Sequence, residues 1–402
     1  MDVQKRIVTS LAVTQIVGSL GIGAGLTIGT LLVKDITGST GWAGMATVVT
    51  VIGAASVTVP LGTMAARFGR RPALMTGWTI ATLGALVSIQ AAVADSLPLV
   101  LLGLALFGAS TSTNLQSRFA AVDRAEPLSM ARSISLVVWA GTIGAVIGPN
   151  LVEPGAVVAR SLEIPPLAGP MVFAAAGFGL AALMTWATLR PEPLAASIGR
   201  SVVRPSIRSA LPHVRGPVAL AIYAIGTAHA VMVAVMALTP VHMQDHGATL
   251  RIIGVTISLH IAGMFALSPI MGWMSDRIGP RPTILAGQTL FIAAAVISGT
   301  AGHSESRIML GLFLLGVGWS ASVIAGAALV STSTDPAVRP LVQSLADLTM
   351  QLSGAVGGLL AGLVVANFGF GVLNAAAALL TVPLIVAVLG ASRPEKVHEP
   401  AR

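Results

Sequence analysis

The chain has 402 residues, of which 54% are hydrophobic and only 9% are charged, and its mean hydropathy is +0.87. A soluble domain carries roughly a quarter of its residues as charged side chains, so this composition excludes an ordinary soluble protein. The net charge of +8 would suit a nucleic-acid partner, but the basic residues fall in short segments between apolar runs. We therefore expect charge to set membrane orientation, and we expect no nucleic acid.

Apolar segments of about 20 residues, long enough to cross a bilayer as a helix, occur twelve times. The spans are predicted near residues 7–33, 41–64, 72–94, 98–121, 131–153, 169–189, 216–239, 251–274, 282–301, 306–330, 340–366 and 371–391. With the start of the chain inside, the basic residues that fall outside are Lys34, Arg160, Arg251 and Arg307. This asymmetry is the positive-inside pattern, so both termini are predicted in the cytoplasm. The excess of Arg over Lys, with much Ala and Gly, is typical of a GC-rich bacterial genome, so the expected location is a bacterial cell (inner) membrane.

The loop after the second span has a counterpart in the second half of the chain. Residues 62–72 read Gly-Thr-Met-Ala-Ala-Arg-Phe-Gly-Arg-Arg-Pro, and residues 272–282 read Gly-Trp-Met-Ser-Asp-Arg-Ile-Gly-Pro-Arg-Pro. A second echo pairs Leu-Gly-Leu-Ala-Leu-Phe-Gly at 102–108 with Leu-Gly-Leu-Phe-Leu-Leu-Gly at 310–316. Two similar halves of about six spans each are typical of a transporter.

The paired loops resemble the signature of the major facilitator superfamily, roughly Gly-x-x-x-Asp-Arg-x-Gly-Arg-Arg. The resemblance implies an all-α membrane protein with twelve helices in two pseudo-symmetric six-helix bundles. It also implies a latch, in which the loop Asp caps a helix across the interface and the loop Arg residues pair with charges after the fourth span. The second copy keeps the Asp, whereas the first copy has Ala66. A loop that only sets orientation would explain the Arg residues but not the repeated Gly and Pro spacing. The candidate latch residues are Gly62, Arg67, Gly69, Arg70, Arg71, Asp123, Arg132, Gly272, Asp276, Arg277, Gly279 and Arg281.

The fourth span places Thr111, Asn114 and Arg118 on one helical face. The resemblance implies that the first, fourth, seventh and tenth helices line a central cavity, so this face and Gln15 of the first span are candidate cavity residues. Arg118 would bind an anionic group or a carboxylate there. The alternative is that Arg118 extends to the inner membrane surface.

The fifth span contains Gly141-Thr-Ile-Gly144-Ala-Val-Ile-Gly148-Pro149. This is similar to the Gly-x-x-x-Gly-Pro element of proton-coupled exporters and favours the 12-helix drug:proton antiporter branch. Gly144 and Gly148 allow close helix contact and Pro149 bends the helix, so a kinked contact near the interface between halves would seal one side of the pathway. Ordinary packing of small residues is the alternative. The chain departs from that branch at Leu104, where an Arg is usual.

The segment 190–215 is rich in Arg and Pro. It is too polar for the bilayer and too short to fold alone, so it is predicted as a cytoplasmic basic linker. It joins an N-terminal bundle, residues 1–189, to a C-terminal bundle with a short cytoplasmic tail, residues 216–402. The linker would lie along the anionic inner leaflet or simply stay flexible.

The seventh span carries His229, Met232 and Met236 at helical spacing, with Tyr223 one to two turns inward. A Met stripe is usually packing, and the other interpretation is an adaptable wall for apolar substrates. Tyr223, His229 and Met232 are therefore candidate cavity residues.

The eleventh span contains a carboxylate, Asp347, about two turns from its inner end. A charge inside the membrane needs a reason because it costs roughly 2.5–3.5 kcal/mol on insertion scales. One reason is proton uptake and release during transport. The other is a structural ion pair with an inner-end arginine, Arg67 or Arg70.

No ATP-binding loop and no catalytic cluster is present, and the absence of Cys excludes disulfides and thiolate metal sites. We therefore expect neither an enzyme nor a cofactor. The preferred function is export of an amphipathic small molecule in exchange for protons by a monomer that alternates access in the lipid bilayer. The alternatives are uptake or facilitated transport of a small solute, and a membrane receptor or scaffold without transport.

Overall fold

The computed structural model describes residues 3–38, 40–194 and 207–391, and all regular structure in these residues is helical. Parts of the predicted linker and the predicted cytoplasmic tail lie outside the described residues. The first half contains α1 (Val3–Thr37), α2 (Thr40–Phe68), α3 (Arg70–Val93), α4 (Leu97–Phe107), α5 (Ala109–Ala120), the short 3-10 helix η1 (Pro127–Ser129), α6 (Met130–Ile147), η2 (Gly148–Leu151), α7 (Val152–Ser161), η3 (Pro166–Ala168) and α8 (Gly169–Thr188).

The second half repeats this pattern of long apolar helices. It contains α9 (Ile207–Ala210), η4 (Leu211–His213), α10 (Gly216–Asp245), α11 (Leu250–Phe265), α12 (Ser268–Ile278), α13 (Pro280–Gly299), α14 (Glu305–Ser333) and α15 (Arg339–Ala391). The pairs α4–α5 and α11–α12 each make one span of the membrane.

The last helix accounts for two of the twelve predicted spans. By length and composition, the described residues contain 11 helical segments that could cross a membrane, and the last of them is 52 residues long. It bends at Gly369, whose φ of 84° and ψ of 172° interrupt the helix. This conformation is essentially restricted to glycine. Gly369 falls between the predicted eleventh and twelfth spans, so the prediction of twelve membrane helices is confirmed.

The predicted fifth span, 131–153, ends earlier in the structure. α6 stops at Ile147, residues Gly148–Leu151 form a 3-10 turn, and the short α7 follows. Pro149 explains this end because proline has no backbone N–H to continue the helix ladder.

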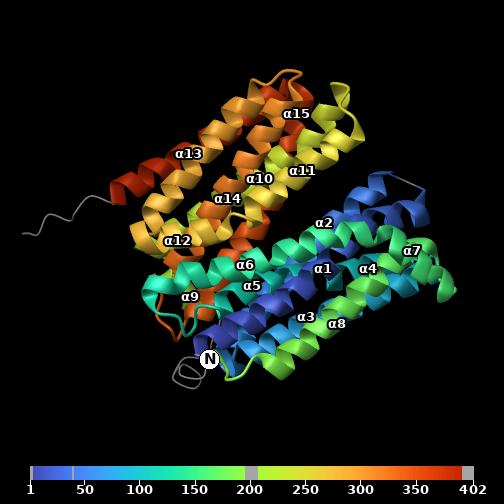
Figure 1. The fold of residues 1–402 in the computed structure, drawn as a ribbon, viewed down its shortest axis with the longest axis horizontal. Coiled ribbons are helices and arrows are strands. Elements are labelled where there is room, and N and C mark those ends of the chain that lie inside the picture. Colours follow the sequence, from blue (N-terminus) through green and yellow to red (C-terminus); the bar gives the residue numbers. More distant parts are fainter. Residues whose placement is uncertain (1–2, 39, 195–206, 392–402) are drawn as a thin grey trace, which may run out of the picture.

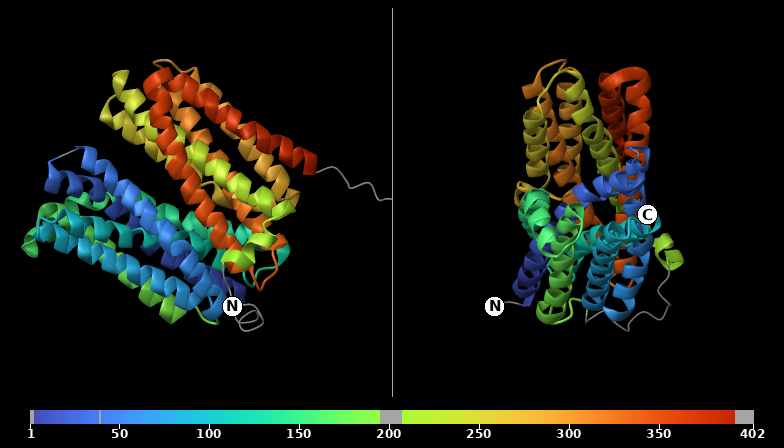
Figure 2. Two further views of the ribbon diagram at one scale, coloured as in Figure 1. Left: turned by 180° about the vertical axis from the view of Figure 1, so that it is seen from behind. Right: turned by 90° about the vertical axis from the view of Figure 1, so that its right-hand side faces the viewer.

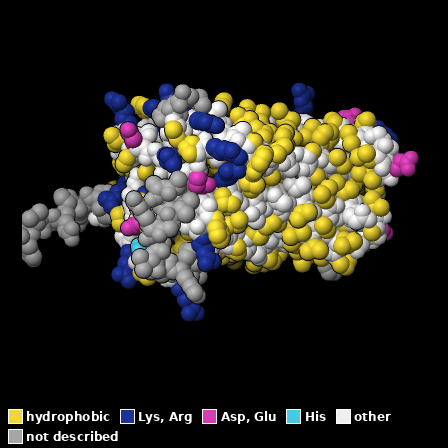
Figure 3. All heavy atoms as spheres, turned by 90° about the horizontal axis from the view of Figure 1, so that it is seen from below, with side chains coloured by type: hydrophobic (Ala, Val, Ile, Leu, Met, Phe, Trp, Pro, Cys, Tyr) yellow, Lys and Arg dark blue, Asp and Glu magenta, His cyan; other side chains and the backbone are white. Residues whose placement is uncertain are grey.

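The helices form two bundles that lie side by side (Figure 1). The bundles approach each other where α12 meets α6 and separate toward the opposite end (Figure 1 and the left view of Figure 2). Lys and Arg gather at one end of the molecule, while hydrophobic side chains cover much of the remaining face (Figure 3). We call this end, which carries the α2–α3 and α12–α13 loops, the basic end.

The second sequence echo has the same packing role in both bundles. A Cβ atom at Gly103 of α4 would lie 2.8 Å from the Ser88 nitrogen of α3, and one at Gly311 of α14 would lie 3.1 Å from the Ala294 carbonyl oxygen of α13. Both glycines therefore let the fourth span of a bundle approach the third span closely. The repeated sequence thus corresponds to an equivalent helix-packing contact in each half.

Candidate functional site

The second copy of the signature loop joins the bundles at the basic end. Asp276 at the end of α12 accepts hydrogen bonds from the backbone nitrogens of Ala131 and Arg132, each at 2.9 Å. These amides begin α6 in the other bundle. A carboxylate at this position satisfies two helix-terminal donors and interacts favourably with the positive end of the helix dipole. The arrangement is the helix cap that the family resemblance implied.

The lack of a side chain at Gly272 allows α12 to pack closely against α6. A Cβ atom at Gly272 would lie 2.7 Å from Ser135 Cβ and 2.8 Å from the Ala131 carbonyl oxygen. Ser268 Oγ also donates to the Ser135 carbonyl at 3.1 Å. Any larger residue at Gly272 would push the two helices apart.

The first copy of the loop makes a related contact with different chemistry. A Cβ atom at Gly62 of α2 would lie 2.7 Å from Ser344 Cβ and 3.2 Å from the Pro340 carbonyl oxygen of α15. Pro340 thus holds the position in α15 that Ala131 holds in α6. Ala66 follows Gly62 by four residues, as Asp276 follows Gly272. Because Pro340 has no backbone N–H, the first copy lacks both the carboxylate and one of the donors that it would cap.

Arg70 strengthens this contact instead. Its Nε donates to Asp123 Oδ2 at 2.8 Å and one terminal nitrogen donates to Asp123 Oδ1 at 3.3 Å. The same terminal nitrogen donates to Gln343 Oε1 of the other bundle. The Arg70 and Asp123 side chains are 1% and 0% exposed, so this is a buried ion pair linked to the second half.

The remaining loop residues have other surroundings. Gly69 and Gly279 adopt φ values of 98° and 100°, which glycine accepts readily. Arg71 is half-buried, and Arg67, Arg132 and Arg277 are exposed. Arg281 is half-buried and lines a pocket together with Gly216 and Ala387, and its interface role stays a prediction.

The linker contributes a residue that sequence reasoning missed. Glu192 accepts hydrogen bonds from the backbone nitrogens of Arg70 at 2.6 Å and Arg71 at 3.1 Å, and therefore caps the start of α3. Arg124 also donates to the Glu192 carbonyl oxygen at 3.1 Å. The available signal was one acidic residue in an otherwise basic linker. At this point the linker is docked on the signature loop rather than flexible.

On the membrane side of these loops, in the last turn of α5 and about two turns from the start of α15, a buried ion pair bridges the bundles. A terminal nitrogen of Arg118 on α5 lies 2.5 Å from Asp347 Oδ1 on α15, and the side chains are 2% and 0% exposed. The expectation that Asp347 pairs with Arg67 or Arg70 is wrong, and so is the alternative that Arg118 extends to the surface. Among the described residues, Arg118 Nε and Asp347 Oδ2 have no hydrogen-bond partner. One donor of Arg118 and one acceptor of Asp347 therefore remain able to bind another group.

The ion pair belongs to a polar stripe on α15. Gln343, Asp347 and Gln351 recur every four residues and share a helix face. Gln343 contacts Arg70, and Gln351 Nε2 donates to Thr58 Oγ1 of α2 at 2.9 Å. The whole stripe is therefore bonded to the first bundle between the basic end and the middle of the membrane.

The other predicted cavity residues of the first half lie on α1 and α5. Asn114 Nδ2 donates to Ser19 Oγ of α1 at 3.1 Å. Gln15 is buried, and its Nε2 would lie 3.7 Å from a Cβ atom at Gly141. Thr111 is half-buried on the same helix as Asn114.

The second half supplies His229 and a tryptophan that sequence reasoning missed. Trp319 Nε1 of α14 donates to His229 Nδ1 of α10 at 3.1 Å. His229 is close enough to Arg118 for an electrostatic interaction, and Met232 is buried one turn away. Tyr223 is misplaced by the prediction, because it is 40% exposed and lines two pockets on the side of α10 away from His229.

The glycine element of the fifth span makes its close contacts with α1. A Cβ atom at Gly144 would lie 2.7 Å from the Ser19 carbonyl carbon, and one at Gly148 would lie 2.6 Å from Gly23 Cα. Both partners are in α1 of the same bundle. These glycines therefore pack α6 against α1 of the same bundle, and the predicted seal near the interface between halves stays a prediction.

Comparisons with known proteins agree with this architecture. A family model described as Major Facilitator Superfamily matches residues 11–259 and 230–402. The chain is 37% identical over 400 residues to YddS of Bacillus subtilis, described as an uncharacterized MFS-type transporter. The aligned region covers 96% of this chain and 90% of that protein.

Two further relatives carry more specific descriptions. The riboflavin transporter RfnT of Brucella anthropi is 28% identical over 340 residues, or 83% of this chain and 84% of that protein. The multidrug resistance protein MdtL of Klebsiella pneumoniae is 28% identical over 102 residues, or 25% of this chain and 26% of that protein.

Among solved structures, FucP in its outward conformation has a TM-score of 0.76 at 17% identity and covers 96% of this chain and 98% of that one. The human organic anion transporter MFSD10 has a TM-score of 0.76 at 15% identity and covers 96% of this chain and 100% of that one.

Proposed function

This chain belongs to the Major Facilitator Superfamily, and we propose that it is a proton-coupled exporter of amphipathic small molecules. It is a multi-pass membrane protein of a family of transporters. The observation that carries the proposal is the ion pair between Arg118 and Asp347, which is buried, lies between the two bundles and is surrounded by polar groups of both.

The ion pair provides a way to couple a proton to the movement of the bundles. In the present arrangement Asp347 of one bundle holds Arg118 of the other. Protonation of Asp347 would remove its negative charge and leave Arg118 without a counter-charge, which weakens a buried pair strongly. The closure at the basic end would then open. We propose that this end faces the cytoplasm, because it carries most of the basic residues.

Exchange follows if the proton and the substrate use the pair in turn. A substrate that enters from the cytoplasm would displace the proton by interacting with Asp347 or Arg118. Asn114, one turn from Arg118 on α5, and His229, which interacts electrostatically with Arg118, would contribute polar contacts. The proton and the substrate cannot occupy the ion pair at the same time. Inward movement of the proton down its gradient would therefore drive the substrate outward. An amphipathic substrate suits these few polar groups beside the apolar side chain of Met232.

Two relatives bear on direction. The match to the multidrug resistance protein MdtL favours export but covers a quarter of the chain. The match to the riboflavin transporter RfnT covers 83% of the chain and favours the second candidate function, uptake of a small solute. Both candidates use the same site, and they differ in whether substrate and proton move in opposite directions.

Inverted membrane vesicles with an inside-acid gradient separate these candidates. A pH-sensitive dye inside the vesicles reports the gradient while compounds of differing charge are added to the outside. Exchange predicts that a transported compound discharges the gradient with the parent protein and not with Asp347→Asn. Equal discharge by both proteins would remove Asp347 from the coupling. No discharge by compounds added outside, together with discharge by a solute loaded inside the vesicles with the acid, would support the second candidate.

The variant needs a structural control, because Asp347→Asn leaves Arg118 buried without a partner. Such a change typically destabilises by about 3–5 kcal/mol. The double variant Arg118→Gln/Asp347→Asn removes both charges and is expected to fold more stably than the single variant. If the double variant folds but still discharges the gradient, the proposed coupling is wrong.

A further inference from the structure

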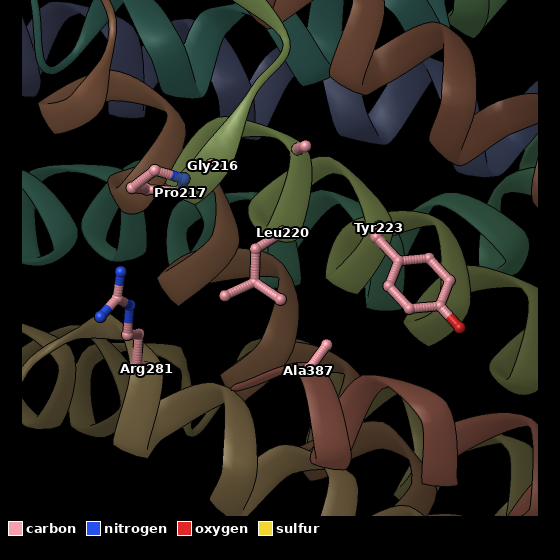
Figure 4. A pocket seen from close by; sticks show the side chains of 7 residues that line it. Gly216, Pro217, Leu220, Tyr223, Arg281 and Ala387 are labelled. Atoms are coloured by element: carbon pink, nitrogen blue, oxygen red, sulfur yellow. The ribbon is translucent and has the colours of Figure 1, made fainter. Parts of the chain in front are cut away.

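A groove on the lateral surface of the second bundle lies between α10 and α15. Its volume is about 440 Å³, and Leu352 and Val356 on its α15 wall are 49% and 55% exposed. It shares Tyr223 with the neighbouring pocket of Figure 4, in which the Tyr223 hydroxyl points away from Arg281. Sites that bind small molecules have volumes of about 300–1,000 Å³, so this groove is large enough for one.

The groove lies within the hydrocarbon core of the membrane. α10 runs from Gly216 to Asp245, and the groove follows it from Tyr223 to Ala230, which is the middle of the helix. This stretch rises about 10 Å, whereas half of a 30 Å hydrocarbon core measures about 15 Å. Phospholipid headgroups lie outside this core. An occupant of the groove must therefore be soluble in hydrocarbon.

Hydroxyl groups without hydrogen-bond partners line the groove. Within the part of the chain that the structure describes, no hydrogen bond is made by the hydroxyls of Tyr223, Thr227, Thr349 and Ser353. Elsewhere on α10 a hydroxyl donates to the carbonyl four residues earlier, as Thr239 does to Val235 at 2.8 Å. Thr227 is only 5% exposed, and a hydroxyl in apolar surroundings is costly without a partner. These groups are therefore available to an occupant that carries acceptors.

The groove is closed off from the proposed transport site. A Cβ atom at Gly357 of α15 would lie 2.6 Å from the Ala230 carbonyl oxygen of α10, and one at Gly354 would lie 2.8 Å from His229 Nε2. The two helices therefore touch between the groove and His229. Leu352 is five residues from Asp347, about 140° around α15. An occupant of the groove contacts the bilayer and not the buried ion pair.

The lining determines the class of occupant. Among the described residues that line the groove, none is charged, which favours a neutral molecule because a charge in hydrocarbon needs a partner. Hydroxyl groups donate to carbonyl oxygens, and the Tyr223 ring offers an aromatic face to a second ring. A quinone with an apolar tail is neutral, dissolves in hydrocarbon and carries carbonyl oxygens on a ring. We infer that this groove binds a lipid-soluble quinone, with its ring beside Tyr223 and its carbonyl oxygens at Thr227 and Ser353.

Binding of decylubiquinone to the protein in phospholipid nanodiscs tests this site, measured as the excess over nanodiscs without protein. Decylbenzene, which has the same tail on a ring without carbonyl oxygens, is the comparison probe. The parent is expected to bind decylubiquinone more tightly. Thr227→Val and Ser353→Ala each remove one hydroxyl. Each is expected to weaken quinone binding about fivefold, the loss of one neutral hydrogen bond, and to leave decylbenzene binding unchanged.

The matched control is Thr289→Val, because Thr289 is an exposed hydroxyl of α13 that donates to Leu285 of its own helix. It is expected to leave quinone binding unchanged. Val356→Phe narrows the groove without removing a hydroxyl and is expected to weaken binding of both probes. Equal binding of the two probes by the parent would overturn the inference, since the groove would then hold only an apolar chain. So would parent-like quinone binding by Thr227→Val and Ser353→Ala. None of these results depends on transport.

Discussion

Asp276 is expected to control how often the basic end opens, and Asp276→Ala removes its carboxylate. The structure shows two backbone N–H groups on this carboxylate, each at 2.9 Å and both at the start of α6. Loss of such a cap costs roughly 0.5–2 kcal/mol. Because the cap joins the two bundles, this energy is lost from the state that is closed at the basic end. A value of about 1.4 kcal/mol within this range raises the open population about tenfold.

The absence of native Cys makes thiol labelling a clean assay for this opening. Ser344 is 1% exposed and packs under Gly62 at the other contact between bundles. A maleimide should therefore label Ser344→Cys only when the basic end opens. Asp276→Ala is expected to raise the labelling rate about tenfold, and Asp276→Asn, which keeps an acceptor oxygen, by less.

Glu126→Gln serves as the matched control, because Glu126 is an exposed acid at the same end. It is expected to leave the labelling rate unchanged. The reasoning is refuted if Asp276→Ala is folded and is labelled at the parent rate.

Two further changes test the fold and the linker. Glu192→Ala removes a cap with two hydrogen bonds from α3 and should lower the free energy of unfolding in detergent by about 1 kcal/mol, whereas an equal effect of Glu126→Ala would contradict a specific docking role. Gly369→Ala forces a side chain into a backbone conformation with φ of 84°. It should lower the free energy of unfolding, measured in detergent, by about 1–3 kcal/mol. Gly362→Ala is its control, because a Cβ atom there meets nothing within 4 Å and alanine favours a helix; if both glycine variants behave alike, the interpretation of the bend fails.

The membrane helices could be predicted from the sequence because each needs about 20 apolar residues and its ends are marked by charge. The helix cap by Asp276 and the pairing of Arg70 with Asp123 could be expected only from the resemblance to the major facilitator superfamily, because the partners lie outside the repeated loop. The break at Gly369 was expected only as a gap between two spans, and its geometry as a bend needed the backbone.

Contacts that depend on how the bundles sit together could not be predicted. Asp347 meets Arg118, 229 residues away in sequence, and no local pattern selects that partner over Arg67 or Arg70. The face of Tyr223 was misassigned because α10 is apolar nearly all round, so periodicity does not distinguish its lipid side from its cavity side. Glu192 was missed because a linker has no periodicity at all.

Proton release on substrate binding tests the proposed coupling most directly. Purified protein in weakly buffered detergent solution is mixed with a compound that discharges the vesicle gradient, and a soluble pH indicator records released protons. The account predicts release of protons by the parent and none by Arg118→Gln/Asp347→Asn at a compound concentration that saturates both. Equal release by the two proteins, or binding without release by the parent, would contradict the claim that proton and substrate use the Arg118–Asp347 pair in turn.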